Sequence, residues 1–247
     1  MFSQLAAPID EWRFEYKYRI SPLQYHALRA AINPYMRADA YTRAAPQGRY
    51  LVRSLYFDSA DLCAYQEKVD GDCDRVKLRI RTYARSLAEN PDLRVEMKAR
   101  KGMSMEKHGA FISAEQYLVF MRSRHWPVAD EPVLLEFERY VRLKMLLPLI
   151  LVEYRREGYS ARAQAGLRIT FDHQVHGAHA AELFPPKPVF RALRRGAIIF
   201  EIKCDKSQPG WLRALVQAQG LRIMANSKFA QGIEAARPEL VQPGWSC

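Results

Sequence analysis

The sequence predicts an α+β fold in which the strands of one large sheet or barrel are surrounded by helices. Segments that alternate polar and apolar residues occur from near the start of the chain to near its end. This period of two is typical of strands, because successive side chains point to opposite faces of a sheet. Segments with helix-start signals lie between them. No internal repeat or low-complexity tract divides the 247 residues, so we expect one domain over 1–247 with its core at about 12–236.

The clearest strand covers residues 75–83, with the sequence RVKLRIRTY. Lys or Arg occupies every odd position as far as Arg81, Tyr83 ends the series, and valine, leucine and isoleucine lie between the cations. One face of this strand therefore carries four cations and the other face is apolar. An ordinary solvated strand can have this pattern, so its meaning depends on the other strands.

The remaining elements follow in order along the chain. Further strands are predicted at 12–20, 50–58 and 93–99, in a segment after Gly102 that carries Lys107, and at 149–157, 168–172 and 197–203. Helices are predicted at 22–32, 61–69, from 113 onward, and at 133–146, 210–218 and 227–236. Ser21-Pro22 is a helix-start signal, and Ser113 with Gln116 has the spacing of a capping box.

The charge balance favours a polyanionic partner. Lys and Arg number 38 against 27 Asp and Glu, which gives a net charge of +11. Phosphate esters, nucleic acid and acidic membrane surfaces all fit such an excess. Nucleic-acid binding rests on net charge alone, and we expect polyphosphate to outcompete DNA.

The chain carries no evident export or membrane signal. Its four cysteines are scattered without a C-x-x-C pair, so we expect no disulfide framework and a cytoplasmic location. Residues 1–11 lack a basic region followed by an apolar one, so we expect no signal peptide. The longest apolar run, 145–152, is interrupted by Pro148, so we expect no membrane-spanning segment.

Charged faces recur on five of the predicted strands. They consist of Arg13, Glu15 and Lys17; Lys77, Arg79 and Arg81; Arg94, Glu96 and Lys98; Tyr154 and Arg156; and Glu201 and Lys203. Like charges on neighbouring strands are destabilising, and two charges 4 Å apart interact by roughly 4 kcal/mol at an effective dielectric of 20. A barrel with helices over its apolar outer face and a polyanion inside its charged face resolves this repulsion. The isolated glutamates favour a divalent cation that bridges to phosphates.

Eight sequence strings carry a family resemblance. They are RFEYKY (13–18), VRSLYFDS (52–59), K-x-D-G-x3-R-x-K-x-R-I-R-x-Y (68–83), VEMK (95–98), VEYRREGY (152–159), LRITFD (167–172), FEIK (200–203) and NSKF (226–229). In this order they resemble the VTC (vacuolar transporter chaperone) polyphosphate polymerase domain, in a bacterial stand-alone form. That domain belongs to the triphosphate tunnel metalloenzyme, or CYTH-like, superfamily.

The resemblance implies an antiparallel β-barrel whose tunnel binds ATP or another triphosphate. The enzyme would be a metal-dependent phosphotransferase that moves the γ-phosphoryl group onto a growing polyphosphate chain and releases ADP. The implied catalytic cations are Arg79, Arg81, Lys98, Arg156, Arg168 and Lys228. Further implied phosphate-binding residues are Lys17, Lys107, Tyr154, Lys203 and Ser227. Glu201 is implied as a ligand of Mn²⁺ or Mg²⁺.

One departure separates the chain from the superfamily's hydrolases. Their first strand has an E-x-E-x-K motif, whereas Arg13 stands at the first glutamate position here. This favours a polymerase over a simple tunnel triphosphatase, which stays as an alternative beside a non-catalytic polyphosphate- or nucleotide-binding module. The eukaryotic polymerases work within a membrane complex, so a membrane-protein partner also stays open.

Other signals are weaker. The Gly-rich motifs G-x-x-x-x-G-K-[ST] and G-x-G-x-x-G are absent from the sequence. His173, His176 and His179 recur every third residue, and we interpret them as a solvated loop rather than a zinc site. Glu153 alternates away from Tyr154, so we expect it to face the helices.

Overall fold

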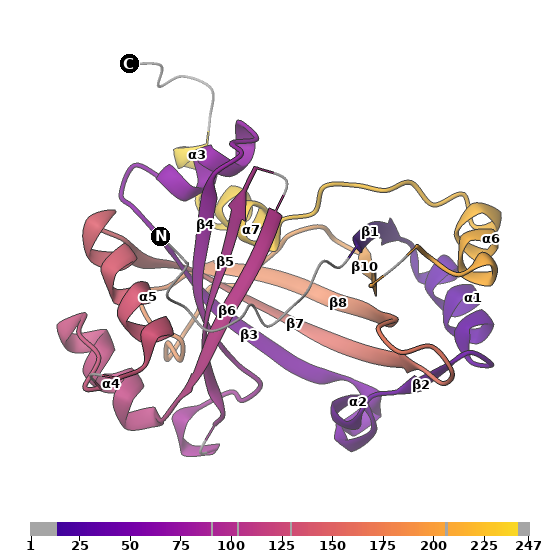
Figure 1. Ribbon diagram of the computed structural model, residues 1–247, viewed down its shortest axis with the longest axis horizontal. Helices are drawn as coiled ribbons and strands as arrows, with labels where there is room; N and C mark the ends of the chain where they lie inside the picture. The colour runs from indigo at the N-terminus through magenta and orange to yellow at the C-terminus, as the bar shows by residue number, and fades with distance from the viewer. Residues whose placement is uncertain (1–13, 90, 103, 129, 206, 242–247) are drawn as a thin grey trace.

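A computed structural model describes residues 14–89, 91–102, 104–128, 130–205 and 207–241. An antiparallel sheet curls into a half-barrel with helices around it (Figure 1). The sheet order is β1-β10-β8-β7-β3-β4-β5-β6, with β2 added to β7 and β9 added to β8. The predicted α+β class and antiparallel, helix-covered architecture are confirmed. Among the described residues no pairing joins β1 to β6, so these two strands form the edges of the half-barrel.

The strand bounds extend several of the predicted segments. The strands are β1 (Phe14–Ile20), β2 (Met36–Ala38), β3 (Tyr50–Asp58), β4 (Arg75–Thr82), β5 (Leu93–Lys101), β6 (Ser104–Ile112), β7 (Leu147–Ala161), β8 (Arg168–His179), β9 (Arg191–Ala192) and β10 (Ile198–Cys204). The long strands β7 and β8 run through the middle of the sheet and support its curvature (Figure 1). Arg13 lies outside the described residues.

Five of the seven described helices begin at a residue whose side chain caps the first turn. They are α1 (Pro22–Ile32), α2 (Ala40–Ala44), α3 (Cys63–Val69), α4 (Ala114–Ser123), α5 (Pro132–Leu143), α6 (Gly210–Ala218) and α7 (Lys228–Ala236). Ser21 and Gln24 form a capping box at α1, and Ser113 and Gln116 form another at α4. Each box satisfies backbone donors that the first turn leaves unpaired.

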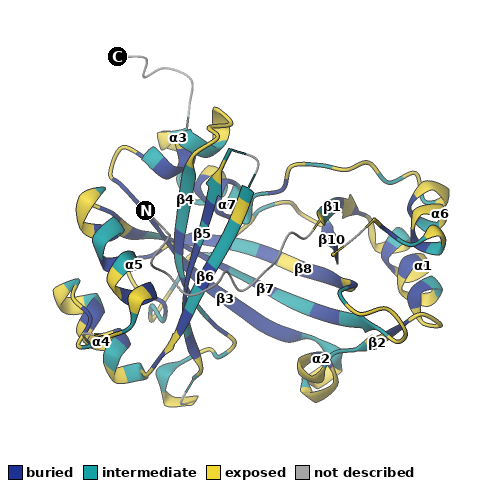
Figure 2. Ribbon diagram, viewed as in Figure 1, coloured by how far each residue is buried: buried dark blue, intermediate teal, exposed yellow. Residues whose placement is uncertain are grey.

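Two hydrophobic clusters cover the outer face of the sheet. At one end α4 and α5 pack on β3–β6, where Phe120 stacks on Trp126 with ring centroids 3.9 Å apart and meets Phe137 edge-on. At the other end α1 and α6 pack on β1, β10 and β8, around the buried Phe171 and Phe200. Figure 2 shows exposed residues gathered on the outward sides of these helices, while the strands are mainly buried or half-buried. The outer clusters therefore leave the opposite face of the sheet as the inner face.

Helix α7 lies against that inner face. Phe229 and Ile233 of α7 pack with Val152 of β7, in a third hydrophobic cluster. Close approach requires glycines here, because a Cβ at Gly177 would lie 3.0 Å from the Cα of Gly232. The first turn of α7 is thereby held beside the charged positions of the strands.

Three histidines, His173, His176 and His179, lie in strand β8. Their interpretation as a solvated loop is therefore wrong. Gln174 has a φ of 51° and interrupts the alternation of β8, which hides the strand from a period-two search. The described cysteines, Cys63, Cys73 and Cys204, are free thiols. None of the described helices is long and apolar enough to cross a membrane.

Candidate functional site

The inner face carries three groups of ionic side chains, and the first is centred on Glu96 of β5. The Nε atom of Arg79 lies 2.6 Å from Glu96 Oε2, and Lys107 Nζ lies 3.0 Å from Oε1. Arg81 and Arg94 approach the same carboxylate at 3.6 and 4.0 Å. Burial raises the pKa of Glu96. The positive charges of Arg79, Arg81 and Lys107 outweigh this effect and lower the pKa well below its usual value. One carboxylate thus faces four cations.

The arginines of this group are fixed by further contacts. Arg79 Nη1 donates to the Tyr56 hydroxyl at 2.8 Å, and Arg81 Nε donates to Ser54 Oγ at 3.3 Å. Both partners come from β3, the neighbour of β4 in the sheet. The guanidinium groups are therefore positioned before any ligand binds, which lowers the entropic cost of binding.

The second group is centred on Asp172 of β8. Arg156 of β7 holds this fully buried carboxylate in a two-point contact of 2.6 and 2.8 Å, and Lys228 of α7 lies 2.6 Å from it. The Tyr154 ring lies beneath both cations, 5.1 Å from the Arg156 guanidinium and 4.9 Å from the Lys228 ammonium. Burial raises the pKa of Asp172, but Arg156 and Lys228 lower it overall. Sequence reasoning missed Asp172 as a site residue, although it shares the alternation of 168–172.

The third group joins the two ends of the sheet. Glu15 of β1 lies 3.4 Å from Lys17, 3.3 Å from Lys98 of β5 and 3.6 Å from Lys203 of β10. Lys203 also lies 3.7 Å from Glu201. The contact between β1 and β5, which are six places apart in the sheet order, exists because the sheet curls. The predicted phosphate-binding lysines of three strands are thus brought together.

Ser227 and Lys77 link α7 to this inner face. Lys77 Nζ donates to Ser227 Oγ at 3.2 Å, and Ser227 also caps α7 by accepting from the Ala230 N–H. Burial, followed by the nearby charges of Arg75, Lys68, Lys98 and Lys17, lowers the pKa of Lys77 to about 7. Burial likewise lowers the pKa of Lys107 to about 8, against the opposing effect of Glu96. Both shifts follow mainly from burial, which disfavours the charged form of an ammonium group.

Taken together, the inner face contains more cations than its carboxylates balance. Among the described residues, the ten cations are Lys17, Lys77, Arg79, Arg81, Arg94, Lys98, Lys107, Arg156, Lys203 and Lys228, and the four carboxylates are Glu15, Glu96, Asp172 and Glu201. Such an excess in a partly buried space stabilises a bound polyanion.

The family follows from a comparison of the sequence with protein-family models. The model described as the VTC domain matches residues 12–237. The chain belongs to the VTC-domain family. The resemblance predicted from eight short strings is confirmed over nearly the whole chain.

One solved structure has a similar fold. A candidate adenylate cyclase from Bacillus halodurans has a TM-score of 0.54 and 13% identity, and the match covers 88% of this chain and 94% of that one. A protein from Pyrococcus horikoshii gives a TM-score of 0.48 with 15% identity, over 90% and 99% of the two chains. No curated protein matches the sequence. The family and the fold together support a protein of the triphosphate-tunnel type.

Not every predicted site residue of this VTC domain joins the three groups. Arg168 lies at the rim, where its Nη2 donates to Asp39 Oδ2 at 2.9 Å and to the Tyr50 hydroxyl at 3.4 Å. Its side chain is 45% exposed. Glu153 pairs with Arg53 at 2.6 Å on the outer face, as the alternation predicted.

The predicted metal ligand, Glu201, has suitable oxygen neighbours. Glu15 and Glu201 both lie beside Lys203, whose Nζ is 3.6 Å from the first carboxylate and 3.7 Å from the second. Thr170 lies directly across from Glu201 in the sheet, and its buried hydroxyl has no hydrogen-bond partner among the described residues. The part of the chain that the structure describes holds no cluster of three or more His, Cys, Asp or Glu side chains arranged for a metal. Mg²⁺ needs no such cluster, because it keeps several waters and is held by one or two carboxylates plus substrate phosphates. The residues present therefore fit a substrate-bridged divalent ion.

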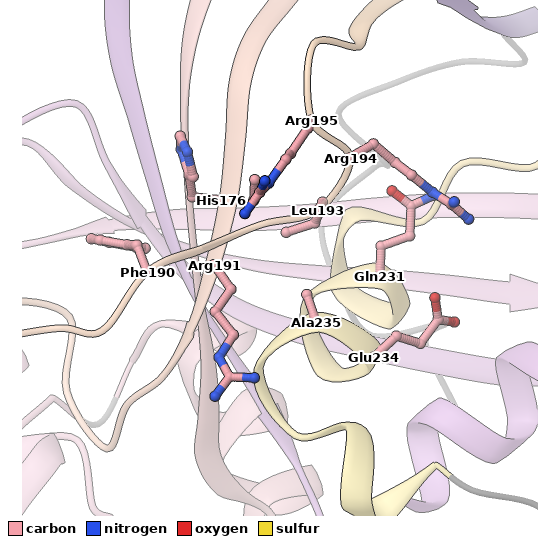
Figure 3. Close-up of a pocket in the computed structure, with 10 residues that line it drawn as sticks. His176, Phe190, Arg191, Leu193, Arg194, Arg195, Gln231, Glu234 and Ala235 are labelled. Atoms are coloured by element: carbon pink, nitrogen blue, oxygen red, sulfur yellow. The ribbon is translucent and has the colours of Figure 1, made fainter.

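Two histidines of β8, His173 and His176, lie outside the three ionic groups. His173 points to the outer face, with Nε2 3.0 Å from Glu157 Oε1 and its ring edge-on to Tyr25. His176 lines a surface pocket of about 590 Å³, together with Arg191, Arg195 and Gln231 (Figure 3). One wall of this pocket is α7 and the other is the segment 190–195, which includes β9. The pocket lies outside the three ionic groups.

Proposed function

We propose that this VTC domain is an ATP-dependent polyphosphate polymerase, which transfers the γ-phosphoryl group of ATP to a growing polyphosphate chain. The observation that carries the proposal is the excess of fixed cations on the inner face of the half-barrel. A polyphosphate chain repeats its negative charge at every phosphate, and the three ionic groups repeat positive charge across six strands and α7. A polyphosphate chain would contact cations over this whole length of the inner face, whereas a single phosphate would contact only a few of them.

The inner-face residues act by positioning and by charge stabilisation. Arg79, Arg81 and Lys107 contact the phosphoryl group in transfer, since they share one carboxylate and so retain unbalanced charge. Arg156 and Lys228 hold the neighbouring phosphates. Phosphoryl transfer needs no covalent protein nucleophile, because the acceptor is a phosphate oxygen that is already ionised.

The remaining residues have supporting roles. Lys17, Lys98 and Lys203 guide the chain beside Glu15. Tyr154 and Ser227 orient the cations that lie against them, and the Ser227 hydroxyl hydrogen is directed to phosphate. Arg168 receives phosphate at the rim. Glu201 with Glu15 would hold Mn²⁺ or Mg²⁺, and the bound ion would neutralise phosphate charge.

Turnover and binding assays together test the proposal. Purified protein is incubated with ATP and Mn²⁺, and ADP, free phosphate and acid-insoluble phosphate polymer are quantified. We expect ADP and polymer. ATP converted to free phosphate without polymer would point to a tunnel triphosphatase instead. Tight polyphosphate binding with no turnover under either metal would point to a non-catalytic binding module.

A competition assay tests the class of partner. We expect polyphosphate to displace labelled DNA from the protein at equal phosphate concentration, because the cations line an inner face rather than an open one. Displacement in the opposite direction would contradict a polyphosphate site.

A further inference from the structure

Three tyrosines gather at one end of the inner face. The ring centroids of Tyr41 and Tyr83 are 5.2 Å apart, those of Tyr41 and Tyr50 are 5.4 Å apart, and those of Tyr50 and Tyr83 are 5.8 Å apart. They come from three separate elements: Tyr41 from α2, Tyr50 from the start of β3, and Tyr83 from just beyond β4. The fold therefore brings them together from distant parts of the chain.

The rings differ in their exposure to solvent. Tyr50 is only 9% exposed and belongs to the inner hydrophobic cluster under α7. Tyr41 is 53% exposed and Tyr83 is 38% exposed, although each already contacts two other rings. Tyr50 thus forms a floor, while Tyr41 and Tyr83 present aromatic surface to solvent.

The tyrosines adjoin the phosphate-binding cations. Tyr50 lies directly opposite Arg156 in the pairing of β3 with β7, and its hydroxyl accepts from Arg168 Nη2 at 3.4 Å. Tyr83, just beyond β4, follows Arg81 by two residues, a separation of about 6.7 Å in extended chain. The order along this face is thus cation, cation and then exposed ring.

We propose that the exposed face of the Tyr41–Tyr83 pair stacks on the nucleobase of a nucleoside triphosphate whose phosphates lie on Arg79, Arg81 and Arg156. This inference rests on the proposed function, because it assumes that the inner face holds the triphosphate. A nucleoside triphosphate has the same order of parts as β4, with phosphates at one end, a ribose between, and a flat aromatic base at the other end. Bases stack on aromatic side chains in proteins that bind nucleic acid strands. The pair would make the site prefer a nucleoside triphosphate to inorganic tripolyphosphate.

Calorimetric binding of ATP and of inorganic tripolyphosphate, both with Mg²⁺, tests this site. The two ligands share the triphosphate but only ATP has a base. In the double variant Tyr41→Ala/Tyr83→Ala we expect ATP to bind about tenfold more weakly and tripolyphosphate to bind as in the wild type. Tyr41→Phe/Tyr83→Phe keeps both rings and should keep the affinity for ATP.

A matched control is available beside the outer hydrophobic cluster around α1 and α6. Tyr35 is 45% exposed and stacks on Trp211 with centroids 4.1 Å apart, in contact with α6 and away from the phosphate-binding cations. Tyr35→Ala should change the affinity for neither ligand. Thermal unfolding of every variant shows whether it is folded.

The possible results separate the two proposals. Equal weakening of ATP and tripolyphosphate in the alanine double variant would overturn the base site, since the rings would then serve only to shape the phosphate site. Unchanged affinity for both ligands would overturn it too, and would leave the polymerase proposal standing. Wild-type protein that binds neither ligand would overturn both proposals.

Discussion

Arg79 and Glu96 form a 2.6 Å ion pair on the inner face, and the Glu96 carboxylate is only 2% exposed. Three further cations meet the same carboxylate. Removal of one partner from a buried ion pair leaves uncompensated charge, at a cost of about 3 kcal/mol. Glu96→Gln should therefore lower the free energy of unfolding by about that amount. Because a polyanion supplies the missing negative charge, tripolyphosphate should raise the melting temperature of this variant more than that of the wild type.

The control for this prediction lies on the outer surface. Glu136 pairs with Arg139 within α5 at 2.6 Å, with the side chains 13% and 30% exposed, and ion pairs within one helix contribute about 0.5 kcal/mol. Glu136→Gln should leave both the stability and its response to tripolyphosphate unchanged. An equal response of the Glu96 variant and the wild type would contradict a polyanion site beside Arg79.

Arg81 gives a sharper test of catalysis than Arg79. Arg79 has close contacts to both Glu96 and Tyr56, whereas Arg81 makes longer ones of 3.6 Å to Glu96 and 3.3 Å to Ser54. Arg81→Ala should therefore keep the fold while the rate of ATP consumption falls by about a hundredfold, the loss typical of one charge-stabilising donor. Arg139→Ala on α5 is the surface control. Wild-type rates in the Arg81 variant would remove this residue from the site.

Anion binding should be linked to proton uptake. In the free protein the pKa of Lys77 is lowered to about 7 and that of Lys107 to about 8, so both ammonium groups are partly deprotonated at pH 8. A bound polyanion favours the charged forms and raises both pKa values. Binding at pH 8 should then take up about one proton, and affinity should fall as pH rises from 7 to 9. Calorimetry of tripolyphosphate binding in buffers of different ionisation enthalpy measures the uptake.

A variant of Lys77 tests whether the protons taken up on tripolyphosphate binding go to this lysine. Lys77→Met should reduce the proton uptake, because the side chain no longer titrates. A binding enthalpy that does not depend on the buffer, in the wild type, would show that these lysines gain no protons when the ligand binds.

Glu157 provides a test of stability that is separate from the inner face. It accepts from Tyr25 and Arg49 at 2.7 Å each and from Tyr159 at 2.9 Å. Burial raises its pKa, but the adjacent His173 ring and the hydrogen bonds from Tyr25, Arg49 and Tyr159 lower it to about 2, from an ordinary value of 4.5. Since the pKa is lower in the folded state, the stabilisation is complete above pH 4.5 and is lost as pH falls towards 2.

The effect of Glu157→Gln on stability should therefore depend on pH. We expect the substitution to lower the free energy of unfolding by about 2 kcal/mol at pH 7 and by much less at pH 3. Urea unfolding at the two pH values measures both effects. Tripolyphosphate affinity should not change, because Glu157 faces α1 and not the inner face. A deficit that is equal at both pH values would contradict the lowered pKa.

The strands with clean alternation were predictable because the pattern is local. Residues 75–83 and 93–99 predicted both the strands and the side on which Arg79, Arg81 and Lys98 lie. Arg79 and Arg81 contact Glu96 of the neighbouring strand, and Lys98 contacts Glu15 across the curled sheet. In β8 the backbone at Gln174 turns to a φ of 51°. The alternation shifts there, so the histidines looked like a loop.

The partners of the cations were less predictable, because they are set by tertiary packing. Asp172 is buried by Arg156 from the neighbouring strand and by Lys228 from α7, which is 56 residues further along the chain. Arg168 lies at the rim because Asp39, the cap of the short and unpredicted α2, holds it there. Neither contact has a signature in the local sequence.

The ratio of phosphate incorporated into polymer to ADP released tests the central claim most directly. It is measured with γ-labelled ATP and Mn²⁺, in the wild type and in Arg81→Ala. A polymerase predicts a ratio near one in the wild type and loss of both products in the variant. ADP accompanied by an equal amount of free phosphate, with no polymer, would contradict the account.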